Sequence, residues 1–188
     1  MNISDLKARA KIQLKSYYWN ILVVVLILIL VMGSSAGIIG LLLTGPLLIG
    51  VNLYKLNIIR KDEENINSIL DGFKGSVGNY IVTYILRGIF VFLWSLLFII
   101  PGIIKWFSYS MTFFILVDNP NLSPTEAIQQ SRDMMKGNKG KLFLLYLSFI
   151  GWFLLVILTL GIGYIFLEPY IQMTVANFYE DLKTQELK

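Results

Sequence analysis

The sequence predicts an all-α polytopic membrane protein: a bundle of about six transmembrane helices in three hairpins, with interfacial amphipathic helices on the cytoplasmic side. Three observations predict this class. Hydrophobic residues make up 56% of the 188 residues and charged residues 15%, whereas a soluble domain carries about 25% charged residues. The apolar residues form three long blocks, each about twice the roughly 20 residues that one spanning helix needs. The basic residues gather between these blocks.

Each apolar block contains a break that suits the turn of a helical hairpin. The block at residues 21–59 is interrupted at 33–37 and again at Gly45-Pro46. The block at 80–117 is broken by Ile-Pro-Gly at 100–102, where a proline suits the first turn of a helix. The block at 142–179 is broken by Gly-Ile-Gly at 161–163, and its last helix is noticeably polar. The blocks therefore predict three hairpins.

Hydrophilic segments before each block have helical amphipathic spacing. In the first segment, an apolar face from Ile3 to Tyr17 lies beside a line of lysines. In the second, Ile66, Ile69, Leu70 and Phe73 repeat that spacing. In the third, the residues from Ser123 to Glu126 form a capping box with proline at the first helical position. One membrane domain, 1–188, with three repeats (1–60, 61–118 and 119–188) accounts for this pattern.

The distribution of basic residues sets the expected orientation. Nearly all of them lie in the amphipathic segments or the C-terminal tail, and the hairpin tips carry almost none, Lys105 being the nearest. By the positive-inside rule, the amphipathic segments and both termini are expected in the cytoplasm. The net charge of +4 is therefore interpreted as a topology signal, and no nucleic-acid partner is expected.

Composition also limits the chemistry. The chain has no cysteine and no histidine, which removes thiolate chemistry, histidine-based triads and most zinc sites. The few remaining acid and base groups show no catalytic spacing. We expect no enzyme activity, no metal and no cofactor.

From Ser131, the string SRDMMKGNKGKLFLLYLSFIGWFLLVILTLGIGYIFLEPYIQMTVANFYEDL resembles the uncharacterised bacterial integral membrane family known as domain of unknown function 975. The elements SFIGW, GIG, EPY and FYEDL carry the resemblance. It extends less distinctively to the basic start and the Ile-Pro-Gly tip. The resemblance implies a bacterial plasma membrane location. It implies no reaction and no catalytic residues.

Four residues are candidates for ligand binding or ion pairing. Arg87 lies about 12 Å into its predicted span at 1.5 Å per residue, where charged residues face a bundle interior or a water cavity. It is either a ligand-binding cation or an internal tether to a carbonyl, a tyrosine or Glu168. Lys105 and Glu168 follow and precede hairpin prolines and are expected to pair near the outer face. Asn52 is grouped with three polar residues of the last helix, Gln172, Thr174 and Asn177, which are expected to turn toward one another.

The lysine-rich start is the strongest candidate for binding anionic lipid. Lys7, Arg9, Lys11 and Lys15 would each contribute about 1 kcal/mol near a charged membrane surface. The alternative interpretation is a simple connector between spans. The small residues at 33–40 lack the Gly-Lys-Ser/Thr of a phosphate loop, and favour close helix contact instead.

Three classes of function remain at this stage. The leading hypothesis is a non-enzymatic module that binds a small or amphipathic ligand or lipid, assists a transporter or another membrane protein, or protects the membrane as immunity proteins do. The alternative is a secondary transporter or channel for a small solute. An intramembrane enzyme is the least favoured class.

Overall fold

The computed structural model describes residues 2–34, 38–61 and 65–186, and no strand occurs among them. The all-α prediction is confirmed. The helices of the described ranges are α1 (Ile3–Ser34), α2 (Ile38–Lys61), α3 (Ser68–Asp71), α4 (Val77–Leu97), α5 (Ile99–Ser108), α6 (Thr112–Asp118), α7 (Pro124–Met134), α8 (Lys139–Leu147), α9 (Ile150–Leu158) and α10 (Ile162–Glu186).

Several predicted helix boundaries have a clear structural cause. The extended residue Phe98 separates α4 from α5 and places Pro101 in the first turn of α5. Leu160 and Gly161 have φ of 52° and 92° and separate α9 from α10, within one residue of the predicted break. Ser123 caps α7 with the predicted capping box. The predicted break at 33–37 lies largely outside the described residues, and the second predicted break is not observed, since Pro46 lies inside α2.

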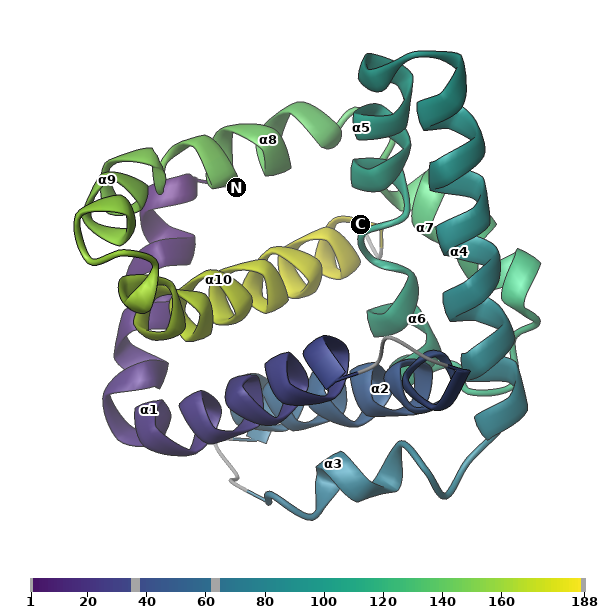
Figure 1. Cartoon of the computed structure of the whole chain (residues 1–188), viewed down its shortest axis with the longest axis horizontal. Helices are drawn as coiled ribbons and strands as arrows, with labels where there is room; N and C mark the ends of the chain where they lie inside the picture. The colour runs from purple at the N-terminus through teal and green to yellow at the C-terminus, as the bar shows by residue number, and fades with distance from the viewer. Residues whose placement is uncertain (1, 35–37, 62–64, 187–188) are drawn as a thin grey trace.

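The N-terminal amphipathic segment and the first apolar segment form one helix, α1, instead of two. Figure 1 shows that α1 changes direction along its length. Its first half runs beside α10, where Gln13 accepts a hydrogen bond from Asn177. Its second half packs on α2 through Val24, Val25 and Leu28. The apolar face of the first half is therefore covered by protein.

The second amphipathic segment is shorter than predicted. Only the four residues of α3 are helical, and Ile69 is buried while Ile66, Leu70 and Phe73 are exposed. Glycines explain this placement. A Cβ on Gly50 of α2 would lie 2.0 Å from the carbonyl oxygen of Ile69, so the two backbones meet directly and leave the other apolar side chains outside.

The core lies where α2, α6 and α10 meet. Buried residues of this core include Leu56, Phe114, Ile115, Ala176 and Phe178. The hairpin of α4 and α5 extends away from it (Figure 1), and Gly102 allows the two helices to touch, since a Cβ there would lie 2.1 Å from Oγ of Ser95.

Five segments are long and apolar enough to cross a membrane by length and composition. They are Ile3–Leu30, Gly40–Lys61, Val77–Leu97, Ile99–Asp118 (α5 and α6) and Lys139–Leu158 (α8 and α9). Helix α10, the polar last helix of the sequence prediction, is not among them. A count of six spans thus stays a prediction.

Candidate functional site

Arg87 lies in the middle of α4 and lines a cavity of about 650 Å³ between α4, α5 and the start of α2. Its guanidinium lies over the ring of Phe113, with the carbon 5.4 Å from the ring centre, and Tyr146 and Tyr84 lie nearby. Nε of Arg87 is buried and has no hydrogen-bond partner among the described residues. No carboxylate of the described chain forms an ion pair with it. The site is a cation without a counter-charge.

The rest of this cavity is apolar and aromatic. Its lining residues are Leu41, Tyr84, Ile85, Gly88, Ile89, Val91, Phe92, Ser95 and Trp106. Ser95 donates its hydroxyl to the carbonyl of Val91 in its own helix. The cavity therefore offers one guanidinium and otherwise mostly apolar surface, which suits a ligand with one anionic group and an apolar body.

A second polar group lies inside the core. Lys55 of α2 is 5% exposed, and its ammonium donates to Oε1 of Gln172 at 2.6 Å. Gln172 in turn donates to Oε1 of Glu168 at 2.8 Å. The hydroxyl of Tyr164 lies close to Glu168 as well. A chain of hydrogen bonds thus connects a buried ammonium to a carboxylate across α2 and α10.

Tyr146 of α8 lies between the two polar groups, near both Arg87 and Glu168. The predicted candidates Arg87 and Glu168 therefore belong to one neighbourhood, although no direct bond joins them among the described residues.

The predicted pair of Lys105 with Glu168 is wrong. Nζ of Lys105 lies 4.2 Å from the ring centre of Trp94, inside its own hairpin, while Glu168 faces Gln172. Lys105 and Glu168 sit at the corresponding positions of two hairpins, but α5 and α10 do not meet there.

The polar residues that were grouped with Asn52 are also dispersed. Asn52 is 6% exposed and lies three residues before Lys55 on α2. Thr174 bonds to the carbonyl of Tyr170 in its own helix, and Asn177 bonds to Gln13 of α1. Only Gln172 turns toward α2.

The four cations of the N-terminal segment divide into two pairs. Lys7 donates to the carbonyl of Ser148 and lies 4.2 Å from the ring centre of Phe149. Arg9 forms an ion pair with Asp181 at 2.7 Å. Lys11 and Lys15 are exposed and have no ion pair or hydrogen bond within the described part of the chain. They line a separate cavity between α1, α9 and α10.

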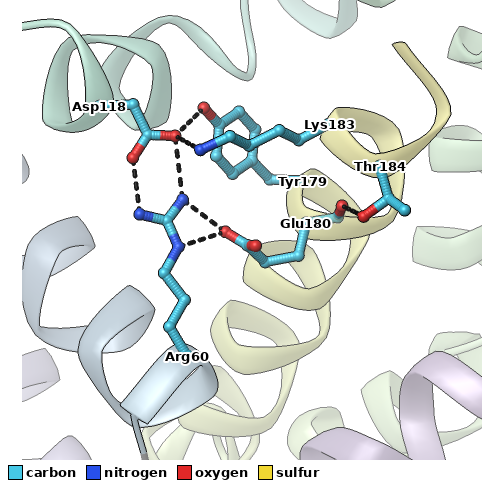
Figure 2. Close-up of polar contacts among 6 residues, drawn as sticks. All are labelled: Arg60, Asp118, Tyr179, Glu180, Lys183 and Thr184. Carbon is cyan, nitrogen blue, oxygen red and sulfur yellow. Dashed lines mark hydrogen bonds and ion pairs between the residues drawn. The ribbon is translucent and has the colours of Figure 1, made fainter. Parts of the chain in front are cut away.

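Charged residues at the ends of α2, α6 and α10 form ion pairs with one another (Figure 2). Asp118, the last residue of α6, accepts from Arg60 at 2.6 Å, from Lys183 at 2.6 Å and from the hydroxyl of Tyr179 at 2.8 Å. Arg60 also pairs with Glu180 at 2.7 Å. Burial and the Asp118 carboxylate raise the pKa of Tyr179, so this phenol stays a hydrogen-bond donor. We name these five residues the Asp118 cluster; it holds the ends of α2, α6 and α10 together.

The sequence analysis did not identify Lys55, Tyr146 or the Asp118 cluster. A signal for Lys55 was available, since it is the one charged residue between Val51 and Ile59. Among the described residues, no group of three or more histidine, cysteine or carboxylate side chains could hold a metal.

The fold and this site define an all-helical protein with several long apolar helices and an unpaired internal cation. Residues 97–186 match the family described as Protein of unknown function (DUF975), which confirms the resemblance inferred from Ser131 onward. The match includes the Ile-Pro-Gly tip, whereas the extension to the basic N-terminal segment stays a prediction. Neither the comparison with curated proteins nor the comparison with solved structures gives a match.

Proposed function

We propose that the protein is a multi-pass integral protein of the bacterial plasma membrane, with cytoplasmic termini, that binds an anionic ligand with an apolar body and catalyses no reaction. The membrane placement is supported by the five apolar segments and by the basic residues between them. Membrane retention after an alkaline carbonate wash tests the placement. Release into the supernatant would contradict it.

Ligand binding rests on one observation, the unpaired Arg87 in its apolar cavity. A charged side chain at depth in a bilayer costs at least about 2.5–3.5 kcal/mol on insertion scales. Paired charges avoid much of this cost, and Arg87 has no pairing carboxylate among the described residues. An anionic ligand would supply the missing charge, and the planar guanidinium suits a carboxylate or phosphate.

A binding experiment on the full chain in phosphatidylcholine nanodiscs tests this proposal. Dodecanoate supplies the carboxylate and dodecanol the same apolar body without charge. We expect the wild type to prefer dodecanoate and Arg87→Gln to weaken its binding at least about ten-fold, since hydrogen bonds to charged groups contribute about 1.5–3 kcal/mol. Arg132→Gln, which removes an exposed arginine of α7, is the matched control. Equal binding by wild type and Arg87→Gln would contradict the proposal.

A secondary transporter or channel is the second candidate, and the Lys55–Gln172–Glu168 chain favours it. Buried ionisable residues in membrane helices commonly mark ion or substrate pathways. Flux of a small carboxylate into liposomes that contain the protein is the test. Flux that Arg87→Ala abolishes supports this class, whereas dodecanoate binding without flux supports the binding module.

A further inference from the structure

The cavity between α1, α9 and α10 lies apart from Arg87 and has a volume of about 590 Å³. Each of the three segments contributes four residues to it at positions i, i+3, i+4 and i+7, which is one face of a helix. The residues are Lys11, Leu14, Lys15 and Tyr18; Trp152, Leu155, Val156 and Thr159; and Gly163, Phe166, Leu167 and Tyr170. Three helix faces thus form one elongated groove.

The floor of the groove is built by the contact of α1 with α10. The hydroxyl of Tyr18 donates to the carbonyl of Phe166, and the hydroxyl of Tyr170 donates to the carbonyl of Lys7, each at 3.2 Å. The hydroxyls of these tyrosines are bound to backbone carbonyls, and their side chains line the groove. The wall on α9 is apolar and open, with Trp152 and Leu155 about half exposed.

Lys11 and Lys15 supply the only formal charges in this lining. Neighbouring cations of the same segment are used inside the protein, Lys7 at Ser148 and Arg9 at Asp181. Lys11 and Lys15 have no such partner among the described residues. Two free ammonium groups beside an apolar groove match a ligand that has an anionic headgroup and a hydrocarbon chain.

We propose that this groove holds one anionic phospholipid of the surrounding membrane, with an acyl chain between α1, α9 and α10 and its phosphate at Lys11 and Lys15. The volume falls within the range of about 300–1,000 Å³ that is usual for ligand cavities. The proposed cytoplasmic side of the N-terminal segment faces the leaflet surface that carries anionic lipid. This site rests on the proposed membrane placement and is separate from the Arg87 cavity.

Trp152 is a reporter inside the groove. The triple variant Trp19→Phe, Trp94→Phe, Trp106→Phe keeps it as the sole tryptophan of the four. In detergent micelles, phosphatidylglycerol with brominated acyl chains quenches tryptophan on contact, and brominated phosphatidylcholine is the zwitterionic comparison. We expect brominated phosphatidylglycerol to reach half-maximal quenching of Trp152 at a lower lipid fraction than brominated phosphatidylcholine. The two fractions should differ by about five-fold for each lysine.

The charge variants decide the origin of this preference. Lys11→Gln with Lys15→Gln is expected to remove it, whereas Lys139→Gln with Lys141→Gln, an equal charge change on α8, leaves it intact. A second reporter variant keeps only Trp106, which lines the Arg87 cavity, and also carries Arg87→Gln, which removes the charge of that cavity. This variant is expected to be quenched equally by both lipids. Circular dichroism verifies that each variant is folded.

Equal quenching of Trp152 by the two lipids would overturn the groove site, as would a preference that survives loss of Lys11 and Lys15. The same preference at Trp106 in the variant that lacks Arg87 would overturn it too, because it would indicate a general attraction of lipid to a basic protein. These results are distinguishable from a failure of the membrane placement, since the carbonate wash measures the placement independently.

Discussion

Helix α2 and helix α4 have similar apolar composition but opposite surroundings. Of the most apolar window of α2, 67% is buried inside the protein, compared with 11% for α4 and 17% for the segment of α8 and α9. Helix α2 packs against α1, α4, α6 and α10, while the hairpin that α4 forms with α5 extends away from the core (Figure 1). The apolar side chains of α2 are therefore covered by protein, and those of α4 are left exposed, which fits the membrane placement that we propose.

The charges of the two helices differ in the same way. Arg60 at the end of α2 is bound by Asp118 and Glu180 (Figure 2), while Arg87 in α4 has no carboxylate partner among the described residues. A paired charge stabilises the fold, and an unpaired one is retained at a cost. The poorly packed side of the molecule is therefore the place to look for function.

The largest expected effect is the loss of Asp118. Asp118→Asn removes the acceptor that Arg60 and Lys183 share, in a place where the Asp118 side chain is only 11% exposed. We expect the free energy of unfolding to fall by about 3 kcal/mol, because the two cations lose their shared counter-charge. Titration with sodium dodecyl sulfate in mixed micelles measures it. Asp133→Asn, at an exposed pair with Lys136, is the control, and an equal loss in both variants would contradict the assignment.

Glycine substitutions sharpen the comparison of packing. Gly50→Ala would place a Cβ 2.0 Å from the carbonyl oxygen of Ile69, and such overpacking costs about 1–3 kcal/mol. Gly88→Ala in α4 meets nothing within 4 Å, so the better helix propensity of alanine is expected to stabilise α4 by up to about 1 kcal/mol. The same micelle titration compares them. If Gly88→Ala instead lowers the free energy of unfolding, the surface of α4 at Gly88 is covered by a partner outside this chain.

How far the sequence predicts this protein depends on the range of each interaction. The break at Gly161, the proline turn of α5 and the capping box at Ser123 are local, because a few neighbouring residues determine the backbone there. Lys55 could not be assigned a partner, since Gln172 lies 117 residues later. Lys105 and Glu168 were paired by their similar sequence context, which does not fix the distance between α5 and α10. Packing between distant helices decided these cases.

Arg87→Leu is expected to act in the opposite direction from Arg60→Leu. Removal of the unpaired cation should raise the free energy of unfolding by about 1 kcal/mol, because the cost of the charge exceeds the cation–π contact with Phe113, which contributes about 0.5–2 kcal/mol. Arg60→Leu should lower it, since Asp118 and Glu180 lose a partner. Parallel micelle titrations of both variants give the signs. A loss of stability in Arg87→Leu would identify Arg87 as a structural tether.

The smallest expected effect concerns the ion pair between Arg9 and Asp181, which joins α1 to α10 at the surface. The two side chains are 43% and 23% exposed, and solvent screening limits such pairs to about 0–1 kcal/mol. A double-mutant cycle with Arg9→Ala and Asp181→Ala measures the coupling in mixed micelles at low and high salt. We expect about 0.5 kcal/mol at low salt and less at high salt. A coupling energy as large as that between Arg60 and Asp118 would mean that the α1–α10 contact is as well shielded from solvent as the Asp118 cluster. The contrast between the paired charges of the core and the solvated charges at its edge would then be wrong.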